Sequence, residues 1–306
     1  MGMDLYPGYM NYLAGGRLKE LAAGLLELLK ECTVCPHHCR VNRQKGELGF
    51  CRAGWEVEIA GYGPHFGEEP PLVGWSGSGT IFFSHCNLGC VFCQNFEISR
   101  GKEGEKVSLE ELASIMLALQ ERGCHNINLV TPSHYVPQII AALSLAAEEG
   151  LRIPLVYNCG GYEERSTLES LDGLIDIYMP DFKYADPEVG MRLSRAPDYP
   201  RVAKEALKEM HRQVGDLEID ARGLARRGLI IRHLVLPEGL AGTREVMDFI
   251  AREISPYSYI NLMDQYYPAG EARRYGALAR RITAAEFGEA LRAARRASPH
   301  FRLEFS

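Results

Sequence analysis

The sequence lacks any run of about 18 or more apolar residues, the length that a membrane-spanning helix requires, so we expect no transmembrane segment. The N-terminus lacks a basic stretch followed by an apolar one, which argues against a secretory signal. Positive charge is not in excess, since the formal net charge is −6, and no basic field of the kind that binds nucleic acid is expected. These absences predict a soluble protein of the cytoplasm.

Cysteine, by contrast, is abundant. Nine cysteines are many for a protein of a reducing compartment, where clustered cysteines bind metal or carry out redox chemistry more often than they form disulfides. Four of them lie between residues 32 and 51 and three between residues 86 and 93, while Cys124 and Cys159 stand alone. We expect Cys124 to be a small buried residue and Cys159 to serve in packing or backbone contacts.

From residue 79 onward, short apolar runs alternate with helical patterns. The runs predict strands over 80–84, 126–130, 153–157, 174–179, 229–236 and 259–263, and the patterns between and after them predict helices over 108–122, 134–149, 163–171, 199–215, 243–254 and 283–297. Ser108 with Glu111, and Thr283 with Glu286, have capping-box spacing at two helix starts. Such alternation predicts an α/β fold with a parallel sheet. Periodicity leaves open whether the sheet is a partial (β/α)6 barrel of the TIM type or an open, doubly wound one.

The chain before this rhythm has a different character. Residues 17–31 place leucines at helical spacing and predict an amphipathic helix, and residues 32–78 are rich in Gly, Pro and Cys with little periodicity. We therefore expect two parts, an N-terminal helix with a Cys-rich metal-binding module over 1–78 and a (β/α)6 core over 79–306.

Cys86, Cys90 and Cys93 directly follow the first strand of the core. Thiolates at this spacing can hold one small cluster from a single loop, because iron–sulfur clusters are ligated by Cys. Three ligands leave one iron of a [4Fe–4S] cluster open, and an open metal position is where a substrate binds. A zinc site and unmetallated core cysteines are the alternatives.

This C-x3-C-x2-C pattern, with Phe92 before the last Cys, resembles the radical S-adenosylmethionine (SAM) superfamily. Later strand ends, which read NCGGY, MPDFK and IRHLVLP, resemble the pyruvate formate-lyase activating enzyme group. The resemblance implies a TIM-like barrel of the radical SAM type with a [4Fe–4S] cluster on Cys86, Cys90 and Cys93. It also implies that SAM binds at the strand ends, with Thr131, Ser133, Asn158, Gly160, Asp181, Lys183 and His233 as the predicted contacts.

One motif of that group is absent. Its Gly-Gly-Glu after the second strand, which holds the SAM amine, is replaced here by Thr131-Pro132-Ser133-His134-Tyr135. Other residues also have plainer interpretations: Asp181 and Lys183 are compatible with a structural ion pair, and His134 with a helix start of no function. Arg232 and His233 alternate along a strand, so one of them must face away from the site.

The resemblance implies an enzyme that reductively cleaves SAM to a 5′-deoxyadenosyl radical, which then abstracts hydrogen. In the activating-enzyme interpretation, the hydrogen comes from a glycine of a partner glycyl radical enzyme, and a flavodoxin or ferredoxin supplies the electron. Direct modification of a small molecule, peptide or RNA is one alternative, and a non-catalytic iron–sulfur electron carrier is another.

The earlier cysteines, Cys32, Cys35, Cys39 and Cys51, form a second metal-ligating set. Four thiolates fit a structural zinc site or a second iron–sulfur cluster, and an unmetallated state stays open as well. A cluster here could relay electrons to the first one, whereas zinc would only staple the module. A nucleic-acid-binding zinc ribbon has modest support from nearby Arg and Lys, but the acidic chain and the lack of interleaved aromatics argue against it.

Overall fold

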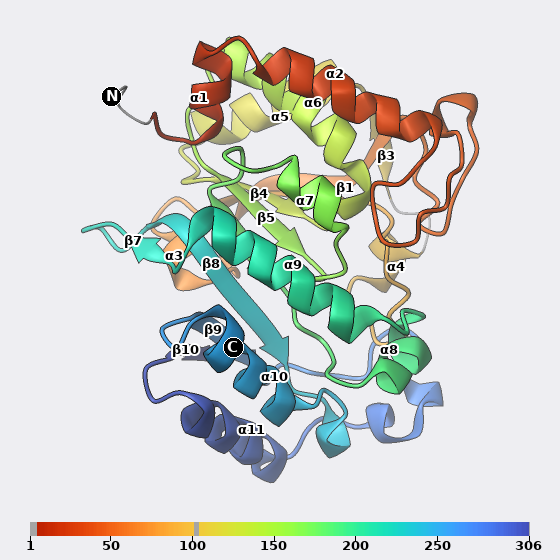
Figure 1. Ribbon diagram of the computed structural model, residues 1–306, viewed down its shortest axis with the longest axis vertical. Helices are drawn as coiled ribbons and strands as arrows, with labels where there is room; N and C mark the ends of the chain where they lie inside the picture. The colour runs from red at the N-terminus through yellow and green to blue at the C-terminus, as the bar shows by residue number, and fades with distance from the viewer. Residues whose placement is uncertain (1–4, 101–103, 306) are drawn as a thin grey trace.

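The computed structural model describes residues 5–100 and 104–305, which form a mostly parallel sheet with helices packed on it (Figure 1). The central parallel strands lie side by side in chain order: β2 (Ser78–Phe83), β4 (Ile127–Val130), β5 (Leu155–Cys159), β6 (Ile177–Pro180), β8 (Ala225–Leu234) and β9 (Tyr259–Met263). A doubly wound sheet would reverse this order at its middle. Right-handed crossovers that always step the same way put their helices on one face, so the partial barrel is confirmed.

Four further strands extend the sheet at its margins: β10 (Arg302–Phe305) parallel to β9, β1 (Val57–His65) antiparallel to β2, β3 (Glu105–Val107) antiparallel to β1, and β7 (Glu218–Ile219) antiparallel to β8. The path of paired strands ends at β10 and β3, so the barrel stays open. β1 corrects the expectation of an irregular segment up to residue 78. Its glycines and proline obscured the alternation that would have identified a strand.

The predicted crossover helices are present as α5 (Leu109–Glu121), α6 (Val136–Glu148), α7 (Arg165–Glu169), α9 (Tyr199–Val214), α10 (Thr243–Phe249) and α11 (Ala284–Ala297). Both predicted capping boxes form, since the Glu111 and Glu286 N–H groups donate to the hydroxyls of Ser108 and Thr283. A π-helical turn, Ile250–Ile254, continues α10, and 3-10 turns precede α6 and follow β8 at Ser133–Tyr135 and Pro237–Gly239. Within the described ranges, no helix is long and apolar enough to span a membrane.

Shorter elements complete the chain: α1 (Tyr9–Ala14), α2 (Leu18–Glu27), α3 (Pro70–Val73), α4 (Phe96–Ser99), α8 (Pro187–Ser194) and 3-10 turns at Leu28–Lys30, Arg43–Lys45, Ala272–Arg274 and Gly276–Ala279. The predicted N-terminal helix is α2, which lies across α6 in Figure 1. Its buried Leu18 and Leu25 belong to the same apolar core as the barrel helices. A domain boundary near residue 78 stays a prediction.

Two apolar clusters determine where a ligand can enter. The larger one fills the space between the sheet and its helices. The smaller one lies inside the barrel, where Val156, Ile177 and Ile230 of the strands meet Leu72 of α3. Because α3 thereby fills the interior of the barrel, the remaining free space lies at the carboxyl ends of the strands, where ligands bind in folds of this kind.

Candidate functional site

A cavity of about 240 Å³ lies at the carboxyl ends of the strands. The loop after β2 supplies one wall, and the ends of β4, β5, β6, β8 and β9 supply the others. The residues that line it include Cys86, Cys90, Cys93, Thr131, Asn158, Gly160, Asp181, Lys183 and Arg232. Residues more than 140 positions apart in the chain therefore face one space.

The three cysteines after β2 all face this cavity, and each sulfur has a hydrogen-bonding neighbour. The Leu88 N–H donates to the Cys86 sulfur over 3.3 Å, and the Ser99 hydroxyl donates to the Cys93 sulfur over 3.3 Å. The Cys90 sulfur lies 2.8 Å from the Ser194 hydroxyl.

Burial raises the pKa of Cys86 to about 12 and raises that of Cys90 as well, so the free thiols stay protonated at neutral pH. Coordination to iron would hold them as thiolates. This set of three donors on one loop, beside an open cavity, fits a [4Fe–4S] cluster with one iron left free of protein ligands.

A charged cluster lines the same cavity as the cysteines. The carboxylate of Asp181 accepts from the Lys183 ammonium over 2.5 Å and from the Arg232 Nε over 2.8 Å, and Arg232 Nη2 donates to the Asn158 side chain over 2.7 Å. Burial opposes ionisation of Asp181, but Arg232 and Lys183 outweigh it and hold the pKa of Asp181 below its usual value. The predicted pair of Asp181 and Lys183 is thus an ion pair that also lines the cavity.

Tyr199, at the start of α9, fixes the backbone around this cluster. Its buried hydroxyl accepts from the Lys183 N–H and lies 2.9 Å from the carbonyls of Gly160 and Asp181. Gly161 makes the close approach possible, because it has a φ of +76° and a Cβ there would lie 2.2 Å from the Asp181 carbonyl oxygen. The two loops therefore present their side chains to the cavity in one fixed arrangement.

The loop after β4 is the place where Gly-Gly-Glu is absent. A buried carboxylic acid, Glu163, supports this loop through hydrogen bonds. Thr131 lines the cavity with a φ of +61°, whereas Ser133 is buried beneath it and donates to Glu163 over 2.6 Å. The Tyr157 hydroxyl donates to the other oxygen of Glu163 over 2.8 Å. Burial raises the pKa of Glu163 to about 7. Ser133 is thus placed to support the loop and not to line the cavity.

Successive side chains of β8 point to opposite faces of the sheet, so only one of Arg232 and His233 can face the cavity. Arg232 points into the barrel, while His233 is fully buried on the opposite face, with ring nitrogens 2.6 Å from the Phe182 carbonyl and 2.9 Å from the Thr243 hydroxyl. His233, predicted as a SAM contact, therefore lies outside the cavity, and Arg232 lies inside it. One of two alternating residues had to face away, but nothing in the sequence indicated which.

Several residues at the site had no signal in the sequence. Ser194 and Tyr184 sit behind Cys90, with their hydroxyls 2.7 Å apart, and Tyr199 fixes the facing loops. All three are buried residues of the chain between β6 and β8, and only the packing of that chain against the cysteine loop brings them to the site. Cys124 is buried just before β4, as predicted, and Cys159 lines the cavity while bonding Glu163.

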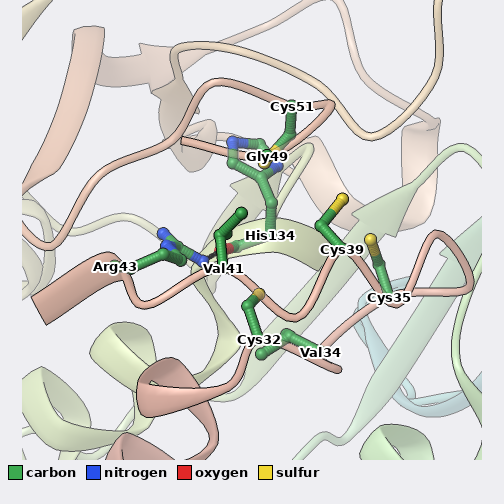
Figure 2. Close-up of a pocket in the computed structure, with 9 residues that line it drawn as sticks. All are labelled: Cys32, Val34, Cys35, Cys39, Val41, Arg43, Gly49, Cys51 and His134. Carbon is green, nitrogen blue, oxygen red and sulfur yellow. Dashed lines mark hydrogen bonds between the residues drawn. The ribbon is translucent and has the colours of Figure 1, made fainter. Parts of the chain in front are cut away.

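The four earlier cysteines line a second, smaller pocket next to the cavity (Figure 2). Cys32, Cys35 and Cys51 are buried and Cys39 is half-buried, and none of the four forms a disulfide. His134, in the 3-10 turn before α6, lines the same pocket. The predicted grouping of the four cysteines is therefore present.

Comparison with known proteins places this fold and site in a family. The Radical SAM superfamily model matches residues 80–216. The uncharacterized protein MJ0674 of Methanocaldococcus jannaschii is 33% identical over 277 residues, which are 86% of this chain and 74% of that protein. The uncharacterized protein MJ0808 of the same organism is 26% identical over 160 residues, 46% of each chain. The chain therefore contains a radical SAM superfamily domain over residues 80–216, and it belongs to the family of MJ0674.

Solved structures with a similar fold include a radical SAM methyltransferase from Sphaerobacter thermophilus, with a TM-score of 0.49 and 15% identity over 74% of this chain and 66% of that one. The FeFe-hydrogenase maturase HydG from Carboxydothermus hydrogenoformans has a TM-score of 0.43 and 17% identity, covering 72% of this chain and 50% of HydG.

Proposed function

We propose that this chain cleaves SAM in the cavity at the carboxyl ends of its strands. The observation that carries the proposal is that Cys86, Cys90 and Cys93 share one cavity with the Asp181, Lys183 and Arg232 cluster. When bound, a reduced [4Fe–4S] cluster and SAM supply a 5′-deoxyadenosyl radical that abstracts hydrogen from a substrate.

The residues of the chain have separate tasks in this proposal. The three cysteines hold the cluster, and Lys183 offers a cation to the carboxylate of SAM, oriented by Asp181. Thr131 and Gly160 line the same cavity and are placed to contact the amine and the nucleoside. Phe82, Phe92, Leu234 and Met263 supply apolar walls, which limit water around a reactive radical.

Formation of 5′-deoxyadenosine tests this function directly. Anaerobically reconstituted protein, given SAM and dithionite, should produce the nucleoside, and Cys90→Ala should abolish its formation. Cys124→Ala is the matched control, because Cys124 is buried just before β4, outside the cavity, and should leave the rate unchanged. Full activity of the Cys90→Ala variant would refute the assignment of the cluster ligands.

We further propose that the hydrogen donor is a glycine of a partner protein, as in the activating enzymes that the strand-end motifs resemble. The test combines the reconstituted enzyme, SAM and dithionite with the macromolecular or the small-molecule fraction of a host extract. An activating enzyme should produce a protein radical whose electron paramagnetic resonance splitting collapses when the host is grown on glycine deuterated at the α-carbon. SAM cleavage stimulated only by the small-molecule fraction would show direct modification instead. Intact SAM with a fully loaded cluster under every condition would favour an electron carrier.

A further inference from the structure

We propose that Cys32, Cys35, Cys39 and Cys51 hold a second iron–sulfur cluster, which passes single electrons to the cluster site at Cys86, Cys90 and Cys93. The binding of the second cluster stands independently of SAM chemistry, while its role as an electron relay rests on the proposed function.

Figure 2 shows the four cysteines around one pocket, and three of them are buried. Val34, Val41 and Arg43 complete its wall. Arg43 is fully buried, and its guanidinium donates to the carbonyls of Gly54 and His134, so it ties the cysteine loop to the barrel. Four thiols around one pocket are the donor set that iron–sulfur clusters use.

Backbone N–H groups point at three of the four sulfurs. The Phe50 N–H donates to Cys39 over 3.3 Å, and the N–H groups of His37 and Ala53 donate to Cys35 and Cys51. Hydrogen bonds of this kind stabilise negative charge on sulfur and tune the potential of iron–sulfur clusters. The loop is therefore shaped for thiolates rather than for thiols packed as small apolar residues.

The loop also adopts strained backbone conformations next to these cysteines. His38, Arg40 and Arg52 have φ values of +41°, +55° and +65°, a region that residues other than glycine seldom occupy. His85 has the same kind of conformation directly before Cys86. Strain of this kind persists where function requires a particular geometry, and both cysteine loops show it.

His134 provides a separate sign of a metal centre in this pocket. Its Nε2 lies 2.8 Å from the Ser84 carbonyl, which can only accept, so Nε2 carries the hydrogen and Nδ1 of the neutral ring bears a lone pair. Nδ1 is buried without a hydrogen-bond partner. A histidine that donates one ring N–H to a backbone carbonyl is oriented as metal-binding histidines are.

The spacing of the thiols favours a cluster over zinc. Zinc holds four thiolates at roughly 2.3 Å from one ion. Among the described residues, no three Cys, His, Asp or Glu side chains converge on a single ion position. This is true also of Cys86, Cys90 and Cys93, whose superfamily places a multi-iron cluster between its ligands.

The second site lies directly against the first. His37, between Cys35 and Cys39 in the chain, donates from Nε2 to the Asn87 carbonyl over 2.8 Å, and Asn87 follows Cys86. The His37 ring stacks on Phe50 with centroids 3.9 Å apart. The Arg100 guanidinium also lies over the Phe50 ring, 4.8 Å from its centre, and donates to the Leu88 carbonyl over 2.7 Å. One hydrogen bond thus joins the two cysteine loops.

The proposed relay moves one electron at a time. A reduced flavin or iron–sulfur protein gives an electron to the cluster on the four cysteines, which returns to its oxidised state when the electron passes to the cluster on the triad. That electron then reduces the sulfonium of SAM, as the proposed function requires. No proton or further reactant enters the relay.

Metal analysis tests the second cluster without any SAM chemistry. In the variant Cys86→Ala/Cys90→Ala/Cys93→Ala, reconstituted anaerobically, we expect bound iron and sulfide and a visible iron–sulfur charge-transfer absorption. Addition of Cys35→Ala and Cys51→Ala should remove them, whereas addition of Cys124→Ala should not. Stoichiometric zinc, or iron and sulfide that do not depend on Cys35 and Cys51, would overturn the proposal.

The relay is tested in Cys35→Ser, with the triad intact. We expect 5′-deoxyadenosine formation to fall at least about tenfold with reduced flavodoxin as donor, and much less with the small reductant titanium(III) citrate, which can reach the triad directly. Equal rates of Cys35→Ser and wild type with flavodoxin would refute the relay. If neither the wild type nor Cys35→Ser forms the nucleoside with either donor, the proposed function fails. The metal analysis still decides whether the second cluster is bound.

Discussion

Replacement of Tyr199 by Phe should separate the geometry of the proposed SAM site from general stability. The change removes one hydroxyl that accepts from the Lys183 N–H and lies 2.9 Å from the carbonyls of Gly160 and Asp181. The ring itself is kept, so its packing against Tyr184 and Phe182 persists. The substitution leaves the buried Lys183 N–H without an acceptor. It also removes the hydroxyl that holds the loop after β5 to the loop after β6.

An orphaned buried donor costs about 1–3 kcal/mol. With an unfolding entropy of roughly 2.1 cal/mol/K per residue over 306 residues, this corresponds to a melting temperature lower by about 2–5 °C. Because Lys183 and Asp181 lose their fixed position, we also expect the KM for SAM to rise several-fold in the 5′-deoxyadenosine assay, with a smaller change in kcat.

Tyr178→Phe is the matched control. Tyr178 is equally buried and donates to Gln213 of α9 over 2.7 Å, on the face of the sheet away from the cavity. It should lower the melting temperature by a similar amount and leave the KM for SAM unchanged. The reasoning fails if both variants show the same KM, or if Tyr199→Phe unfolds at the temperature of the wild type.

Three further expectations concern single positions. Gly161→Ala should abolish SAM-dependent activity or folding, since its Cβ would lie 2.2 Å from the Asp181 carbonyl oxygen, whereas Gly150→Ala, at a positive-φ glycine in open space, should only lower stability modestly; soluble yield and nucleoside formation check this. Burial raises the pKa of Glu163 to about 7, above the unfolded value near 4.5, so its contribution is fully present below pH 4.5 and is lost as pH rises to 7, at up to about 1.4 kcal/mol per pH unit. Glu163→Gln should flatten that part of the stability profile in chemical denaturation, and an unchanged slope would contradict the assignment. Burial lowers the pKa of His233 to about 4, so its contribution is present above pH 6.5 and is lost as pH falls towards 4, and His233→Gln should weaken that dependence in the same measurement.

The sequence by itself determined the class of fold and the grouping of the cysteines. Both were legible because they rest on local signals: apolar runs alternating with helical patterns from residue 79, capping boxes at Ser108 and Thr283, and three cysteines within eight residues. Such signals are independent of how distant segments pack. The one strand hidden in the Cys-rich region, β1, carries glycines and a proline that erase its alternation.

Only the tertiary structure decided which side chains reach the cavity. Arg232 faces it and His233 does not, because one residue of shift along a strand reverses the face and the sequence does not fix the register. Ser133 turned out to lie beneath the loop, bound to Glu163, and Tyr199 came to the site from a helix start with no motif. The contact of His37 with Asn87, which joins the two cysteine loops, likewise depends on chain segments 50 residues apart and exists only once the barrel has folded.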